Sequence, residues 1–149
     1  ILCEGNGSCH KLKKHGRDPN TMKEGNEDIL YSRWTREHYF GGEREHDRLD
    51  AAKEIHENAA LESASWGLFQ IMGYHWESLS YKSVKDFVRL MHKSEGEHIK
   101  AFGRFILANN LSKYLKSKDW AGFAKRYNGP GYKTNKYDEK LARAYNKYK

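Results

Sequence analysis

Residues 62–73 read ESASWGLFQIMG, an unusually apolar stretch in a chain whose mean hydropathy is −0.99. One Glu, two Ser and one Gln lie in it among Trp, Leu, Phe, Ile and Met. A core strand would be apolar throughout, and a surface loop would not carry so many large apolar side chains. A binding cleft uses both kinds of residue, because apolar side chains line it and polar groups orient the ligand. We therefore interpret this stretch as a helix end followed by the wall of a cleft.

The residues before this stretch predict a helix. Leu49, Ala52, Ile55 and Ala59 recur at three- and four-residue spacing, which is the apolar stripe of an amphipathic helix. Glu62 occupies the next position on the stripe. Its carboxylate is therefore expected to point toward the core or toward a cleft that opens from it.

The rest of the chain favours a mainly α fold, because it contains only two prolines and many helix-forming residues. A β-prone, aromatic segment at 29–35, together with 38–42, predicts a small β-hairpin or an irregular insertion. A length of 149 residues predicts a single domain over 1–149, and the abrupt start predicts that it is excised from a longer chain. Further helices are predicted over residues 8–16, 83–91, 97–110, 119–128 and 138–148.

The net charge of +7 predicts attraction to polyanions such as nucleic acid, anionic lipids or the acidic polymers of a bacterial envelope. We expect no nucleic-acid partner, because no groove of alternating basic and aromatic residues is evident. We expect no membrane insertion either, because no apolar run approaches the ~18 residues of a membrane span. Cys3 and Cys9 are expected to be free thiols, with a disulfide as the alternative.

Among the residue types that could carry out catalysis, carboxylates are the remaining candidates in this sequence. Residues 56–60 read HENAA, which lacks the second His of a helical zinc motif, so no metal site is expected. No GxSxG nucleophile motif occurs. Glycoside cleavage needs a protonated acid in a partly apolar setting, and Glu4 and Glu62 both occupy such settings. The alternative is that each is an ordinary surface or capping Glu.

Three segments carry a resemblance to a known family. They are GLFQI at residues 67–71, YNGPGY at 127–132, and ILCE at 1–4 followed by LKKHGRDP at 12–19. Together they resemble the N-acetylmuramidase domain of phage endolysins, which belongs to the lysozyme superfamily with goose-type lysozymes and lytic transglycosylases. The resemblance covers essentially the whole chain and implies an α+β, lysozyme-like fold.

The resemblance also implies residue roles, and a reaction that requires no metal or organic cofactor. Glu4 would be the general acid that cleaves the β-1,4 bond after N-acetylmuramic acid, and Glu62 is the candidate second carboxylate. Trp66 and Phe69 are expected to pack beneath the cleft floor, with stacking on a sugar as the alternative. The candidate contacts for N-acetyl and hydroxyl groups are Ser65, Gln70, Tyr127 and Asn128.

The implied partner is the peptidoglycan glycan strand, and the protein is expected to act on it as a monomer. Its site of action would be the bacterial cell wall or periplasm, after synthesis in the host cytoplasm and release at lysis. Two alternatives remain open at this stage: a lytic transglycosylase that forms anhydro products, and a non-catalytic module that binds the cell wall.

Overall fold

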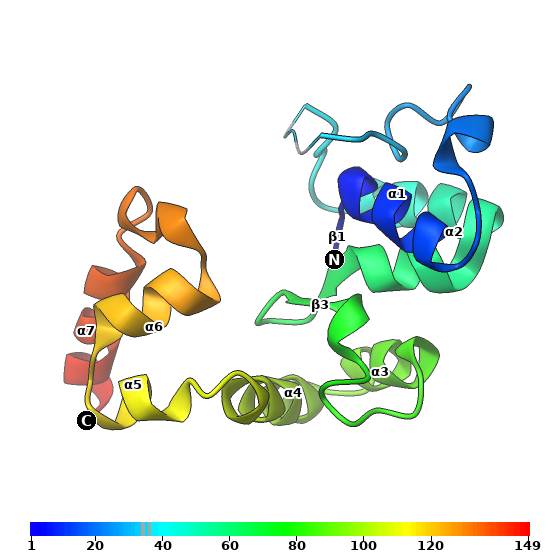
Figure 1. The fold of residues 1–149 in the computed structure, drawn as a ribbon. Helices are drawn as coiled ribbons and strands as arrows, with labels where there is room; N and C mark the ends of the chain where they lie inside the picture. Colours follow the sequence, from blue (N-terminus) through cyan, green and yellow to red (C-terminus); the bar gives the residue numbers. More distant parts are fainter. Residues whose placement is uncertain (34, 36) are drawn as a thin grey trace. The chain divides into compact units, whose positions relative to one another are not determined.

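The computed structural model describes residues 1–33, 35 and 37–149 (Figure 1). The chain divides into two compact units, residues 1–102 and 103–149, and each is described separately below. The fold is mainly α-helical with a small antiparallel sheet, which confirms the predicted fold class.

Two helices form the centre of unit 1. Helix α1 (Gly5–Lys14) packs against α2 (Arg44–Ser63), as Figure 1 shows. Leu12 of α1 and Leu49, Ala52 and Ala59 of α2 are buried, so the predicted apolar stripe faces the core. The predicted stop at Gly16 is also confirmed, because this residue has φ 73° two positions after α1 ends.

Helix α2 is interrupted at His56, which the sequence pattern did not predict. The His56 backbone is extended, with φ −164° and ψ 104°. Its Nδ1 accepts a hydrogen bond of 3.2 Å from the Ala59 backbone N–H, three residues on, as an N-capping side chain does. The last part of α2 therefore starts as a newly capped segment, and it contains Glu62.

The sheet joins the amino terminus to the stretch at 62–73. Strand β1 (Leu2–Cys3) pairs antiparallel with β2 (Ala64–Trp66), which pairs antiparallel with β3 (Ile71–Met72). The register is Cys3 opposite Ala64 and Trp66 opposite Ile71. The β2–β3 connection uses positive φ angles at Gly67 and Gln70, which tighten the turn.

Of the two alternatives predicted for 29–42, a small β-hairpin or an irregular insertion, the irregular one is observed, because none of the described residues 29–33, 35 and 37–42 lies in a strand. Trp34 and Arg36 lie outside the described residues. Side chains of α2, rather than a neighbouring strand, bind the backbone of this segment. The Phe40 and Gly41 N–H groups donate to Glu45 Oε1, at 2.9 and 3.3 Å.

The other elements of unit 1 are η1 (Pro19–Met22), η2 (Gly73–His75), α3 (Val84–Met91) and the first part of α4 (Glu95–Ala108). Ser83 caps α3 as predicted, since its hydroxyl accepts from the Asp86 N–H at 3.1 Å. Phe87 and Met91 are buried on the inner face of α3.

Unit 2 holds the end of α4, α5 (Ser112–Lys116), α6 (Trp120–Tyr127), η3 (Pro130–Lys133) and α7 (Tyr137–Tyr148). Asp119 caps α6 by accepting from the Gly122 N–H at 2.8 Å. Helix α6 packs on α7 with Phe123 and Ala124 buried, so the two helices predicted here are confirmed. Across the described residues, no helix has the length and apolarity needed to cross a membrane.

Candidate active site

Glu4 lies at the junction of β1 and α1, where it is the N-cap residue of the helix. Its backbone N–H donates to the Ser63 carbonyl at 3.1 Å, and its own carbonyl accepts from the Ser8 N–H at 2.9 Å. The side chain is partly exposed, and burial raises the pKa of its carboxyl group above the ordinary value. The Glu4 backbone is thus held in place, and its carboxyl group favours the protonated form more than a free carboxyl does.

A buried ion pair holds the strand that leads to Glu4. Glu45 Oε2 accepts from the Cys3 N–H at 3.0 Å and from Arg48 Nη1 at 2.9 Å, and Arg48 Nη1 also donates to the Cys3 carbonyl at 3.1 Å. Burial alone would raise the pKa of Glu45, but its backbone hydrogen bonds and the Arg48 charge outweigh burial, so this pKa is lowered. The residue before Glu4 is therefore bound at both its N–H and its carbonyl.

Glu62 lies in the last turn of α2 and is only 4% exposed. Its Oε1 accepts from Trp76 Nε1 at 3.0 Å, and its Oε2 lies 3.3 Å from His15 Nε2. Since Ser63, the next residue, binds the Glu4 backbone, the structure brings the segments of the two candidate carboxylates together. The prediction that Glu62 points inward is confirmed by its burial.

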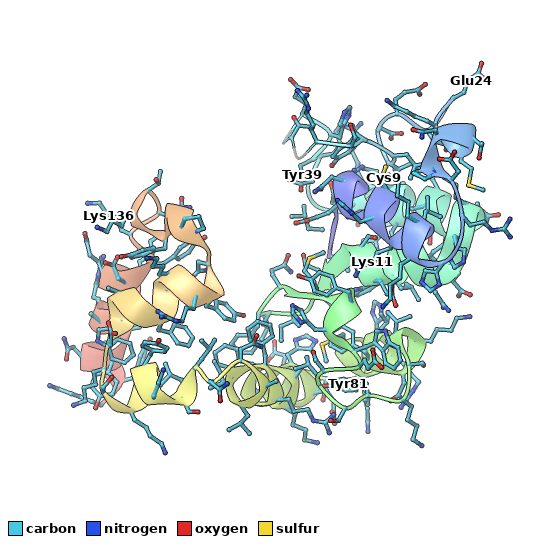
Figure 2. The ribbon with its side chains drawn as sticks, in the orientation of Figure 1. Cys9, Lys11, Glu24, Tyr39, Tyr81 and Lys136 are labelled. Atoms are coloured by element: carbon cyan, nitrogen blue, oxygen red, sulfur yellow. The ribbon has the colours of Figure 1, made fainter. Side chains whose placement is uncertain are left out.

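Side chains of α1 and η2 surround these carboxylates, and sequence reasoning missed them. Lys11, labelled in Figure 2, lies with its Nζ 4.2 Å from the centre of the Tyr74 ring. Burial lowers the pKa of Lys11, while the charge of Glu62 opposes this change. Burial raises the pKa of Tyr74, and the charge of Glu4 adds to the effect.

Helical spacing was a signal that could have found part of this group. Ser8, Lys11 and His15 follow Glu4 by four, seven and eleven residues, which is the repeat of one helix face. No spacing rule could have found Tyr74 or Trp76, because they reach the site through the fold.

Ser65 and Gln70 lie next to each other in the β2–β3 hairpin. The Ser65 hydroxyl donates to Gln70 Oε1 at 2.8 Å, and Gln70 Nε2 donates to the Gly67 carbonyl at 2.9 Å. Ser65 is buried and Gln70 is exposed. The turn is also held from α4, since His98 Nδ1 accepts from the Leu68 N–H at 3.3 Å.

The aromatic residues of the hairpin pack, as expected. Trp66 is 2% exposed and donates from Nε1 to the Leu61 carbonyl at 3.0 Å. The Phe69 ring stacks on Phe102, with 4.2 Å between ring centres. Both rings therefore contribute to the support of the hairpin.

Tyr127 and Asn128 belong to unit 2, at the end of α6. The Tyr127 ring packs against Phe105 and Phe123, and burial raises the pKa of its hydroxyl to about 12. Asn128 is exposed, and its N–H donates to the Ala124 carbonyl at 2.8 Å. The contacts described above for Glu4, Glu62, Ser65 and Gln70 all lie within unit 1.

The described residues contain no group of three or more His, Cys, Asp or Glu side chains that could hold a metal ion. Cys3 and Cys9 are free thiols, and burial, partly offset by the Arg48 charge, raises the pKa of Cys3 to about 11. The described site offers a partly buried carboxyl group with a raised pKa, on a backbone held by hydrogen bonds, and a buried second carboxyl group on the segment that binds this backbone. That arrangement suits proton donation to a leaving group.

Two comparisons with known proteins found matches. The family model described as Muramidase, N-acetylmuramidase, matches residues 1–149. The crystal structure of a Burkholderia AP3 phage endolysin is similar, with a TM-score of 0.91 and 40% sequence identity over 99% of this chain. The match covers 55% of that endolysin chain, so this chain spans about half of its length. No curated protein matched.

Proposed function

This chain belongs to the N-acetylmuramidase family, and from that premise we propose that it hydrolyses the β-1,4 bond between N-acetylmuramic acid and N-acetylglucosamine in peptidoglycan. Glu4 is the general acid. It protonates the glycosidic oxygen as the bond to the leaving sugar breaks. The observation that carries this assignment is the burial that raises the pKa of Glu4 at a position held on both sides by backbone hydrogen bonds.

In this mechanism Glu62 acts as the second carboxyl group. Hydrogen-bond partners occupy both of its oxygens, and the side chain is buried. These contacts favour an electrostatic role over direct activation of a water molecule. A negative charge at Glu62 would stabilise the positive charge that develops on the sugar ring in the transition state.

The proposed sugar contacts are polar side chains. Gln70 is exposed on a turn that hydrogen bonds hold rigid, and Ser65 supports its amide. Amides and hydroxyls pair well with N-acetyl and hydroxyl groups of a sugar, because each can donate and accept. Tyr127 and Asn128 are proposed to bind the same kinds of group.

We further propose that residues 1–149 form one catalytic domain, which acts as a monomer on the bacterial wall after release from the host cytoplasm at lysis. The family model spans both units, which supports this proposal. The net charge of +7 would draw the protein to the anionic wall.

The test compares clearing of purified peptidoglycan by the wild type, Glu4→Gln and Glu24→Gln. Glu24 is an exposed glutamate, labelled in Figure 2, and serves as the matched control. Loss of a general acid lowers the rate by about 10²–10⁴-fold, so Glu4→Gln should be nearly inactive while Glu24→Gln keeps the wild-type rate. Clearing by Glu4→Gln at the wild-type rate would exclude Glu4 as the acid.

Mass spectrometry of the digest tests the reaction itself. Hydrolysis leaves a reducing muramyl end, whereas a transglycosylase leaves an anhydro end that is lighter by the mass of one water. Anhydro products from the wild type would exclude the hydrolytic mechanism. Binding to the wall without any cleavage would exclude both reactions.

A further inference from the structure

We propose that His15 is a positioning residue that holds the Glu62 carboxylate in its working orientation. This inference rests on the proposed function, because it gives His15 a role in the same reaction. His15 lies in the LKKHGRDP segment quoted above, where the resemblance gives it no role, and it lies 47 positions before Glu62 in the sequence.

Both oxygens of the Glu62 carboxylate are contacted by side chains from different parts of the fold. Trp76, directly after η2, binds Oε1 at 3.0 Å, and His15, at the end of α1, lies 3.3 Å from Oε2. A carboxylate held at one oxygen can still rotate about its terminal bond, whereas one held at both oxygens cannot. The contact with His15 therefore completes the orientation of the group.

His15 is itself held in place. Its ring lies against the His56 ring, with 4.6 Å between centres and 30° between planes. His56 is the residue at which α2 breaks and restarts, and its Nδ1 is occupied by the Ala59 N–H. The His15 ring thus connects α1 to the start of the short helical segment that carries Glu62.

Lys11, whose charge interacts with Glu62, does not replace this contact. Lys11 attracts Glu62 electrostatically, but its ammonium group lies over the Tyr74 ring. Removal of the His15 ring therefore leaves one Glu62 oxygen without its partner in a buried position. A buried carboxylate in that state shifts or rotates to recover a hydrogen bond.

The test uses three substitutions at one position. Leu removes the hydrogen bond, Gln extends an amide nitrogen to about the place of the imidazole Nε2, and Asn is too short to reach Glu62. We expect His15→Leu and His15→Asn to lower kcat on soluble glycan oligomers by about tenfold, with little change in KM, and His15→Gln to restore most of it. His10→Leu, an exposed histidine on the same helix, is the matched control and should keep the wild-type kcat.

A double-mutant cycle separates positioning from simple support of the fold. If His15 acts through Glu62, then His15→Leu should cause no further loss of kcat in a Glu62→Gln background. Equal losses in both backgrounds would overturn the inference. Equal kcat for the Asn and Gln variants would also overturn it, and this comparison decides the question if His15→Leu fails to fold.

These outcomes are distinct from failure of the proposed function. If the wild type releases no muramyl ends, the proposed reaction is wrong and the role given to His15 is withdrawn with it. If the wild type and His15→Leu cleave with the same kcat, the reaction stands and only the role of His15 is excluded.

Discussion

Replacement of Glu45 by Gln tests how the site is anchored. The Glu45 carboxylate is fully buried and accepts four hydrogen bonds, from the N–H groups of Cys3, Phe40 and Gly41 and from Arg48. A glutamine at this place has one acceptor oxygen and one NH₂ group. The NH₂ group would face N–H donors, and the Arg48 charge would lose its partner.

The cost follows from these contacts. Breaking a buried ion pair by removal of one partner costs about 3–5 kcal/mol, because the other charge stays buried without compensation. A domain of this size has a total stability of about 5–15 kcal/mol, so the substitution consumes a large part of it. At about 2–4 °C per kcal/mol, the melting temperature should fall by about 6–20 °C.

Asp50→Asn is the matched control, because Asp50 also pairs with a cation three residues on in α2, but the Asp50 side chain is 70% exposed. Exposed pairs contribute about 0–1 kcal/mol, so its melting temperature should barely change. Thermal unfolding followed by circular dichroism measures both variants. Equal shifts for the two variants would refute the argument that the buried pair anchors β1.

Three further predictions concern other residues of unit 1. Gly73→Ala should destabilise by about 1–3 kcal/mol, because its Cβ would lie 2.0 Å from a backbone oxygen of α2, while Gly131→Ala meets nothing within 4 Å and should melt near the wild type. Iodoacetamide should label the partly exposed Cys9 in the folded protein and Cys3 only after unfolding; equal labelling by mass spectrometry would contradict the burial of Cys3. Burial raises the pKa of Glu4, so the folded state binds its proton more tightly and loses stability as pH rises through that pKa. Denaturant titrations should therefore find that Glu4→Gln is more stable than the wild type at neutral pH, and that this difference in stability shrinks on acidification. No difference at neutral pH would mean that Glu4 ionises in the folded protein as freely as in the unfolded chain.

Local pattern was sufficient for most of the helices. The stripe from Leu49 to Ala59, the Ser83 cap and the stop at Gly16 depend on residues within a few positions of one another, and all three are confirmed. Local pattern left two alternatives at 29–42, a small hairpin or an irregular insertion. The irregular form is observed among the described residues, where Glu45 of α2 binds the backbone.

The mixture of polar and apolar residues at 62–73 was informative for a physical reason. Large apolar side chains are mostly buried in folded proteins, so Trp66 was expected to be buried, and it is. The sequence by itself therefore determined the helices, the packing side of the hairpin and the choice of carboxylates as the candidate chemistry.

Only the tertiary structure decided what surrounds those carboxylates. The pairing of β1 with β2 joins residues about 60 positions apart, and Glu62 meets His15 and Trp76 from two other elements. Such contacts depend on how whole elements pack, and the spacing of apolar residues within one helix does not predict which elements pack together. The raised pKa of Glu4 has the same origin, because burial, rather than the identity of its neighbours in sequence, disfavours its charge.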